Sequence, residues 1–156
     1  MTKLITFVCT GNICRSTMGE QVARARASEL GTQARFDSAG ISDEEEGNPI
    51  DPRAARTLRA HGYPVGDHRA KQVTRALIES SDLVLAFEPV QLNRMKRLAP
   101  DAENICLVTD FHPAGATGSG IEDPWYYGQE AFEQTLEAIE EAMPGLFRMI
   151  TEQAAR

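Results

Sequence analysis

Cysteines, histidines and long apolar runs are all scarce in this sequence. Its 156 residues contain three cysteines and three histidines. Three cysteines cannot form a disulfide framework, so the thiols are better suited to chemistry than to holding the fold. The histidines are scattered and no zinc spacing is present, so we expect no metal and no cofactor. No apolar stretch approaches the ~20 residues of a membrane span. We therefore expect a cytoplasmic protein without a membrane partner.

Positive charge is also in short supply. The sequence has 16 Lys and Arg against 23 Asp and Glu, which gives a formal net charge of -7. Binding to a phosphate backbone depends on clustered Lys and Arg, so nucleic acid is excluded as the main partner. An anionic substrate would instead need a locally positive pocket. The length and an apolar content of 42% predict a single domain over residues 1–156.

Predicted strands alternate with predicted helices along the chain. The strand candidates are 3–9, 34–40, 82–88 and 104–111, and the helix candidates are 16–30, 52–61, a segment after Pro89 and a long C-terminal segment. The first helix has an apolar stripe of Met18, Val22, Ala25 and Leu30. This alternation predicts an α/β protein with a parallel sheet and helices on both faces. Ligands of such folds bind beyond the carboxyl ends of the strands.

The segment "FVCTGNICRSTMGE" follows the first predicted strand and holds two of the three cysteines. A loop of this size before a helix can direct backbone N–H groups at an anion, and Gly11 permits the turn. The same N–H groups would stabilise a Cys9 thiolate, to which the Ser16 hydroxyl could donate. Arg15 can hold two oxygens of a phosphoryl group. The predicted phosphate-binding residues are Thr10, Gly11, Asn12, Ile13, Cys14, Arg15 and Ser16. The competing interpretation is a buried cysteine followed by a surface arginine.

A second segment, "IEDPWYYG" (121–128), supplies a proton donor for a leaving group. It belongs to a stretch rich in Gly and Pro, 112–129, of the kind in which functional loops concentrate. Asp123 precedes Pro124, which favours an extended backbone at the aspartate. Trp125 and Tyr126 could form the wall of a pocket for a flat leaving group. Taken alone, Asp-Pro would be a simple turn.

Five segments together resemble the low-molecular-weight protein tyrosine phosphatases: "VCTGNICRS", "SAG" (38–40), "DPRA" (51–54), "DHRAKQ" (67–72) and "DPWYYG". The resemblance covers nearly the whole chain. It implies a three-layer, flavodoxin-like phosphatase fold with four parallel strands in the order 2-1-3-4 and helices on both faces.

The resemblance also implies roles for particular residues. Cys9 would be the nucleophile, Arg15 the phosphate clamp and Asp123 the general acid, acting on a phosphotyrosine protein through a cysteinyl-phosphate intermediate and releasing inorganic phosphate. Asn12, Ser38 and His68 would support the loop. Cys14 could form a reversible disulfide with Cys9, or be a small buried side chain. Cys106, in the predicted fourth strand, is interpreted as core packing.

One departure from the family pattern bears on the substrate. Members usually carry an aromatic residue in the segment 41–49, where this chain has Glu44, Glu45 and Glu46. The glutamates are either a solvated loop or a rim of the substrate cleft that repels acidic phosphopeptides and tolerates basic or small substrates.

Three alternatives to a tyrosine phosphatase stay open. Relatives specialised for phosphoarginine tend to carry threonine at position 13, so Ile13 favours an aryl phosphate. A thiol-dependent arsenate reductase needs further cysteines on a mobile segment, and Cys106 lies in a predicted buried strand. A phosphate-binding module without activity would have no use for Asp123.

Overall fold

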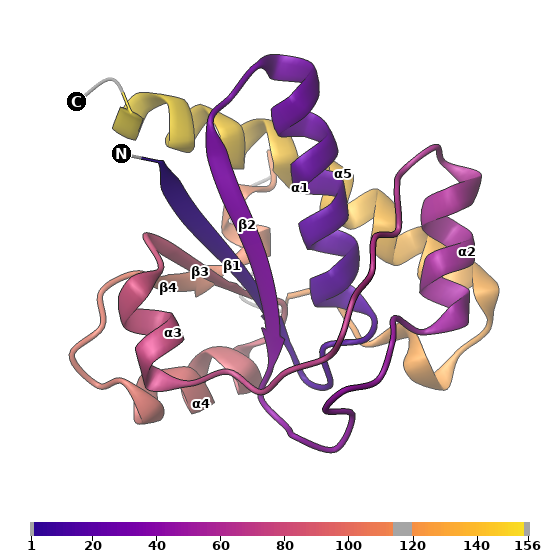
Figure 1. Ribbon diagram of the computed structural model, residues 1–156, viewed down its shortest axis with the longest axis horizontal. Coiled ribbons are helices and arrows are strands. Elements are labelled where there is room, and N and C mark those ends of the chain that lie inside the picture. Colours follow the sequence, from indigo (N-terminus) through magenta and orange to yellow (C-terminus); the bar gives the residue numbers. More distant parts are fainter. Residues whose placement is uncertain (1, 114–119, 155–156) are drawn as a thin grey trace.

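Helices cover both faces of a central sheet in the computed structural model, which describes residues 2–113 and 120–154 (Figure 1). The sheet has four parallel strands in the order β2-β1-β3-β4. The predicted fold class and strand order are both confirmed. No helix in the described part of the chain is long and apolar enough to cross a membrane.

The strands and helices follow one another in the predicted alternation. In chain order they are β1 (Lys3–Cys9), α1 (Arg15–Leu30), β2 (Ala34–Gly40), α2 (Pro52–Ala60), α3 (Arg75–Ser80), β3 (Leu83–Ala86), α4 (Pro89–Leu98), β4 (Ile105–Leu107), the 3-10 turns η1 (Val108–Phe111) and η2 (Pro124–Tyr126), and α5 (Gln129–Ala154). In Figure 1, α1, α2 and α5 lie on one side of the sheet, whereas α3 and α4 lie on the other.

The sheet is buried on both faces because β1 and β3 carry consecutive apolar residues. Phe7 faces the larger core, under α1 and α5, and the next residue, Val8, faces the smaller core, under α3 and α4. Both side chains are fully buried. Successive side chains of a strand point to opposite faces, so an uninterrupted apolar run is typical of a strand covered on both sides.

The structure differs from the predicted elements in four places. The predicted strand 82–88 is shorter, Leu83–Ala86, and the predicted strand 104–111 ends at Leu107. The chain then turns into η1, where the Asp110 carboxylate accepts a hydrogen bond from the Leu107 N–H. Helix α3 was not predicted, since only Ile78 of its six residues is buried. Leu30, assigned to the apolar stripe of α1, is 63% exposed, and the buried face instead includes Ala23 and Ala27.

The carboxyl ends of β1 and β2 meet at one edge of the sheet, with Cys9 paired to Gly40 in register. A Cβ at Gly40 would lie 2.7 Å from the Thr10 carbonyl oxygen, so glycine is needed for this close approach. The segment that follows Cys9 therefore packs directly on the end of β2.

Candidate active site

Three segments from distant parts of the sequence line one cavity of about 170 Å³ beyond the carboxyl end of β1. The first is residues 9–15, here called the phosphate loop. The second contains Glu44 and Glu45, here called the acidic rim. The third is residues 120–128, a part of the predicted loop 112–129 that is here called the acid loop; residues 114–119 lie outside the described residues. The cavity is lined by Cys9, Thr10, Gly11, Ile13, Cys14, Arg15, Ser42, Glu44, Glu45, Asp123, Trp125 and Tyr126.

Cys9 is the last residue of β1, and its side chain is 3% exposed. The Ser16 Oγ, in the first turn of α1, lies 3.1 Å from the Cys9 Sγ. The sulfur therefore faces the N-terminus of a 16-residue helix, where free N–H groups and the helix dipole favour negative charge. The predicted hydroxyl contact to the sulfur is present in this geometry.

Asn12 holds the phosphate loop in an unusual backbone conformation. Its φ is 61°, a value that residues with a Cβ rarely adopt. The side-chain Nδ2 donates hydrogen bonds to Ser16 Oγ (2.8 Å) and Ser38 Oγ (3.0 Å), while its Oδ1 accepts one from the Lys71 N–H (2.9 Å). His68 Nε2 lies 2.6 Å from the Asn12 carbonyl oxygen. The three predicted supporting residues thus meet at the loop.

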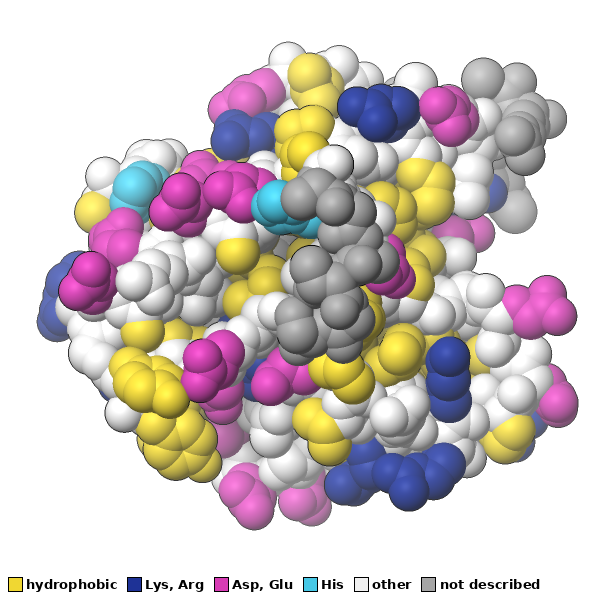
Figure 2. Space-filling model, turned by 180° about the vertical axis from the view of Figure 1, so that it is seen from behind, with side chains coloured by type: hydrophobic (Ala, Val, Ile, Leu, Met, Phe, Trp, Pro, Cys, Tyr) yellow, Lys and Arg dark blue, Asp and Glu magenta, His cyan; other side chains and the backbone are white. Residues whose placement is uncertain are grey.

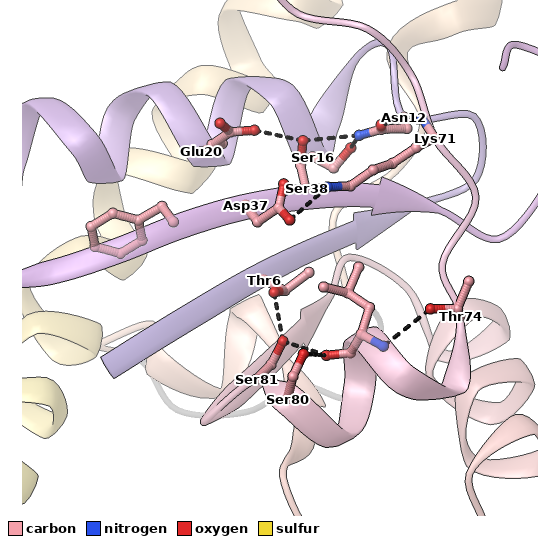
Figure 3. Close-up of polar contacts among 12 residues, drawn as sticks. Thr6, Asn12, Ser16, Glu20, Asp37, Ser38, Lys71, Thr74, Ser80 and Ser81 are labelled. Atoms are coloured by element: carbon pink, nitrogen blue, oxygen red, sulfur yellow. Dashed lines mark hydrogen bonds and ion pairs between the residues drawn. The ribbon is translucent and has the colours of Figure 1, made fainter. Parts of the chain in front are cut away.

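Figure 3 shows that this network extends from the loop into helix α1. The Ser38 hydroxyl, on β2, donates a 2.6 Å hydrogen bond to the Glu20 carboxylate. Glu20 is nearly buried and forms an ion pair with Arg24 one helical turn later. Sequence reasoning did not identify Glu20. The side chains of Asn12, Ser38 and Glu20 each have hydrogen-bond or ion-pair partners in this network, so the network favours one loop shape.

Arg15 is a buried cation whose side chain is 1% exposed. Its Nη1 donates to the Glu88 carboxylate and, at 2.8 Å, to the Ile121 carbonyl oxygen. Its Nη2 lies 3.6 Å from an Asp123 carboxylate oxygen. The Nε has no hydrogen-bond partner among the described residues. A buried guanidinium needs such hydrogen-bond partners, and in this side chain, which lines the cavity, the Nε donor is left without one in the described part of the chain.

Asp123 lines the same cavity as the phosphate loop and lies beside Arg15. One carboxylate oxygen caps η2 by accepting a 3.0 Å hydrogen bond from the Trp125 N–H, and the other is the oxygen near Arg15. The Trp125 and Tyr126 side chains, 42% and 81% exposed, form an outer wall. In Figure 2, which shows the molecule from behind, hydrophobic side chains gather at the lower left edge of the view, beside acidic ones.

Glu88 and Gln91 contact this site but were not predicted to. Glu88 follows β3 and pairs with Arg15, and Gln91 is 1% exposed. The Gln91 Nε2 donates to Thr10 Oγ1 at 3.1 Å, and its Oε1 accepts from the Glu88 N–H at 2.9 Å. The available signal was their position, since both lie within a few residues after the end of β3, a strand whose carboxyl end should face the site.

The two cysteines other than Cys9 differ in their surroundings. Cys14 is 5% exposed and lines the cavity. Burial, followed by the charges of Asp51, Cys9 and Asp123, raises the pKa of Cys14 well above the usual thiol range, so it stays protonated. Cys106 lies in β4, half-buried against the larger core and outside the cavity lining. Burial and the Asp110 charge raise the pKa of Cys106 to about 12.

The acidic rim adds negative charge to the mouth of the cavity. Glu44 is exposed, and Glu45 is partly buried with its carboxylate accepting a 2.7 Å hydrogen bond from Asn48. The third glutamate, Glu46, does not line the cavity. No group of three or more His, Cys, Asp or Glu side chains within residues 2–113 and 120–154 is placed to hold a metal ion.

Known proteins are similar to this chain in sequence and in fold. The family described as "Low molecular weight phosphotyrosine protein phosphatase" matches residues 4–156. A low molecular weight protein-tyrosine-phosphatase of Streptomyces coelicolor is 42% identical over 159 residues, covering 98% of this chain and 96% of the relative. A protein tyrosine phosphatase of Entamoeba histolytica, with Hepes in its active site, has a TM-score of 0.91 at 25% identity and 98% and 99% coverage. Wzb of Vibrio vulnificus, in complex with benzylphosphonate, has a TM-score of 0.84 at 28% identity and 96% and 99% coverage. The chain belongs to the low molecular weight phosphotyrosine protein phosphatase family.

Proposed function

We propose that the protein hydrolyses phosphotyrosine in protein substrates, and small aryl phosphates, through a cysteinyl-phosphate intermediate. One observation carries the proposal: Cys9, Arg15 and Asp123, which come from opposite ends of the sequence, line the same small cavity. The nucleophile, the cation and the carboxyl group are the three parts that such a transfer needs.

In the first step the substrate phosphoryl group occupies the phosphate loop, between the backbone N–H groups and the Arg15 guanidinium. The Cys9 thiolate attacks phosphorus and forms a P–S bond, while the P–O bond to the tyrosine breaks. The electron pair of that bond goes to the phenolic oxygen, which takes a proton from the Asp123 carboxyl group. Cys9 and Asp123 line the same small cavity, which supports a bound phosphoryl group that both residues can reach.

In the second step the Asp123 carboxylate removes a proton from water, and the water oxygen attacks phosphorus. The P–S bond breaks, Cys9 leaves as a thiolate and inorganic phosphate is released. The Ser16 hydroxyl, 3.1 Å from the sulfur, supports the leaving thiolate by donating a hydrogen bond. Charge in both steps is balanced by Arg15 and the helix N-terminus, so the proposal includes neither a metal nor another cofactor.

Aromatic walls support an aryl phosphate as the substrate. Trp125 and Tyr126 line the cavity mouth, and the V. vulnificus neighbour binds an aromatic phosphonate. Ile13 also lines the cavity, as expected for an apolar contact with a ring. We further propose that residues 1–156 act as one domain and work in the cytoplasm, where cysteines such as Cys9 and Cys14 are kept as free thiols.

The first test is hydrolysis of p-nitrophenyl phosphate in EDTA by the wild type and by Cys9→Ser, Asp123→Ala and Cys106→Ser. We expect turnover by the wild type and by Cys106→Ser, the matched thiol control outside the cavity. Cys9→Ser should be inactive, and Asp123→Ala should lose about 10²-fold or more. No turnover by freshly reduced wild type would refute the proposal. Phosphotyrosine peptides, phosphoarginine peptides and arsenate then separate the remaining alternatives by their relative kcat/KM.

A further inference from the structure

Arg53, the second residue of α2, makes contact with the acid loop from outside the cavity. Its Nη1 donates hydrogen bonds to the carbonyl oxygens of Trp125 and Tyr127, both at 3.1 Å. Trp125 is the middle residue of η2 and Tyr127 directly follows it, and η2 begins directly after Asp123. One guanidinium nitrogen therefore holds the middle and the C-terminal end of the turn that follows Asp123.

The Arg53 guanidinium is itself held in place from three sides. The Asp51 carboxylate accepts hydrogen bonds from Arg53 Nε at 3.2 Å and from Nη2 at 3.1 Å. The guanidinium carbon lies 5.2 Å from the Trp125 ring centroid and 4.6 Å from that of Phe132. Side-chain hydrogen bonding to Asp51 raises the pKa of Arg53 above its usual value. The planar group is therefore both paired and stacked, a geometry that lysine cannot reproduce.

Asp51 connects this clamp to the phosphate loop. Its backbone N–H donates a 2.9 Å hydrogen bond to the Ile13 carbonyl oxygen, and its side chain is nearly buried. Asp51 also caps α2 by accepting from the Arg53 N–H at 2.7 Å. A short, continuous path therefore runs from the loop that holds the nucleophile, through the start of α2, to the loop that holds the general acid.

We propose that Arg53 is a positioning residue for the general acid, and that it sets the distance of Asp123 from the phosphate loop. The inference rests on the proposed function. Trp125, Tyr126 and Tyr127 are all exposed, so side-chain burial does little to hold the tip of this loop. A shift of about 1 Å in a reacting group can cost about 10²-fold in rate. Without the two carbonyl contacts, Asp123 would be less well placed to protonate the leaving oxygen.

Contacts independent of the Arg53 side chain hold α2 against α5. Gln129 Nε2 donates to Thr57 Oγ1 at 2.5 Å, and Arg56 Nη1 donates to Gln129 Oε1 at 3.2 Å. The Arg53 side chain is also about one third exposed. Removal of this side chain should therefore loosen the acid loop while the fold is retained. Arg56→Ala is the matched control, because Arg56 lies on the same helix and contacts α5 but not the acid loop.

The test uses the dependence of kcat/KM on the leaving group, because a poor leaving group depends more on protonation by the general acid than a good one does. Wild type, Arg53→Ala, Arg53→Lys and Arg56→Ala are compared on p-nitrophenyl phosphate and phenyl phosphate. General acids contribute about 10² to 10⁴, so Arg53→Ala should lose at least about tenfold more on phenyl phosphate than on p-nitrophenyl phosphate. Arg53→Lys should lose less, and Arg56→Ala should match the wild type. Melting temperatures establish that each variant is folded.

A double variant separates positioning from a general loss of structure. If Arg53 acts through Asp123, adding Arg53→Ala to Asp123→Ala should steepen the leaving-group dependence no further. Equal losses on both substrates, or no loss in either Arg53 variant, would overturn the inference while leaving the proposed function intact. If Arg53→Ala does not fold, an unchanged leaving-group dependence in folded Arg53→Lys overturns it equally. An inactive wild type would instead overturn the proposed function.

Discussion

Asn12 offers the most quantitative test of how the phosphate loop is held. Replacement by alanine removes three side-chain hydrogen bonds, to Ser16, Ser38 and the Lys71 N–H. At a net value of about 1 kcal/mol each, their loss lowers the free energy of unfolding by about 3 kcal/mol. Alanine at a φ of 61° adds about 1 kcal/mol of backbone strain. We therefore expect a loss of about 4 kcal/mol, or about 10 °C in melting temperature.

Two further variants test the reasoning behind this expected loss of stability. Asn12→Gly loses the same hydrogen bonds but adopts positive φ without strain, so it should be about 1 kcal/mol more stable than Asn12→Ala. Asn48→Ala removes an exposed asparagine and should change stability by less than about 0.5 kcal/mol. Urea unfolding followed by circular dichroism measures all three. A destabilisation below about 1 kcal/mol for Asn12→Ala would refute the view that this network supports the loop.

Two other predictions concern the cavity mouth and the buried thiol in β4. Glu44→Lys combined with Glu45→Lys should raise kcat/KM on an acidic phosphotyrosine peptide about tenfold at low salt, and Glu46→Lys, outside the lining, should change it less. Equal effects of the two changes would contradict a role for the acidic rim in selecting the substrate. The raised pKa of Cys106 means that its folded form keeps its proton longer than the unfolded chain does. Its contribution to stability is complete below a pH of about 8.5 and is lost as pH rises toward 12. Unfolding between pH 7 and 10 should thus be less pH-dependent in Cys106→Ala, and identical curves would contradict this.

Local patterns were enough to predict most of the scaffold. The apolar run 3–9 became β1, and Asp51-Pro52 caps α2 as its residue types require. The predicted boundaries were wrong where the apolar pattern does not mark the end of an element. The fourth strand ends at Leu107 because the Asp110 carboxylate turns the chain there, and α3 is too short to show a helical period. Leu30 completes an apolar spacing but lies at the exposed end of α1.

The phosphate loop was predictable because its residues are adjacent in the sequence. The residues that contact it and the acid loop are distant in the sequence. Glu88 is 73 positions from Arg15, and Arg53 is 72 from Trp125. No periodicity or spacing rule links residues so far apart, and both look like ordinary surface charges in sequence. Only the packing of β1 beside β3, and of α2 beside α5, brings them to the site.

The central claim is that the phosphoryl group passes through Cys9, and trapping that intermediate tests it most directly. The protein is mixed with p-nitrophenyl phosphate, quenched on the millisecond scale and digested, and the phosphorylated peptide is identified by mass spectrometry. The account predicts a single phosphoryl group on the Cys9 sulfur, absent from Cys9→Ser and present in Cys106→Ser. A phosphoryl group on any other residue, or turnover by Cys9→Ser at the wild-type rate, would contradict it.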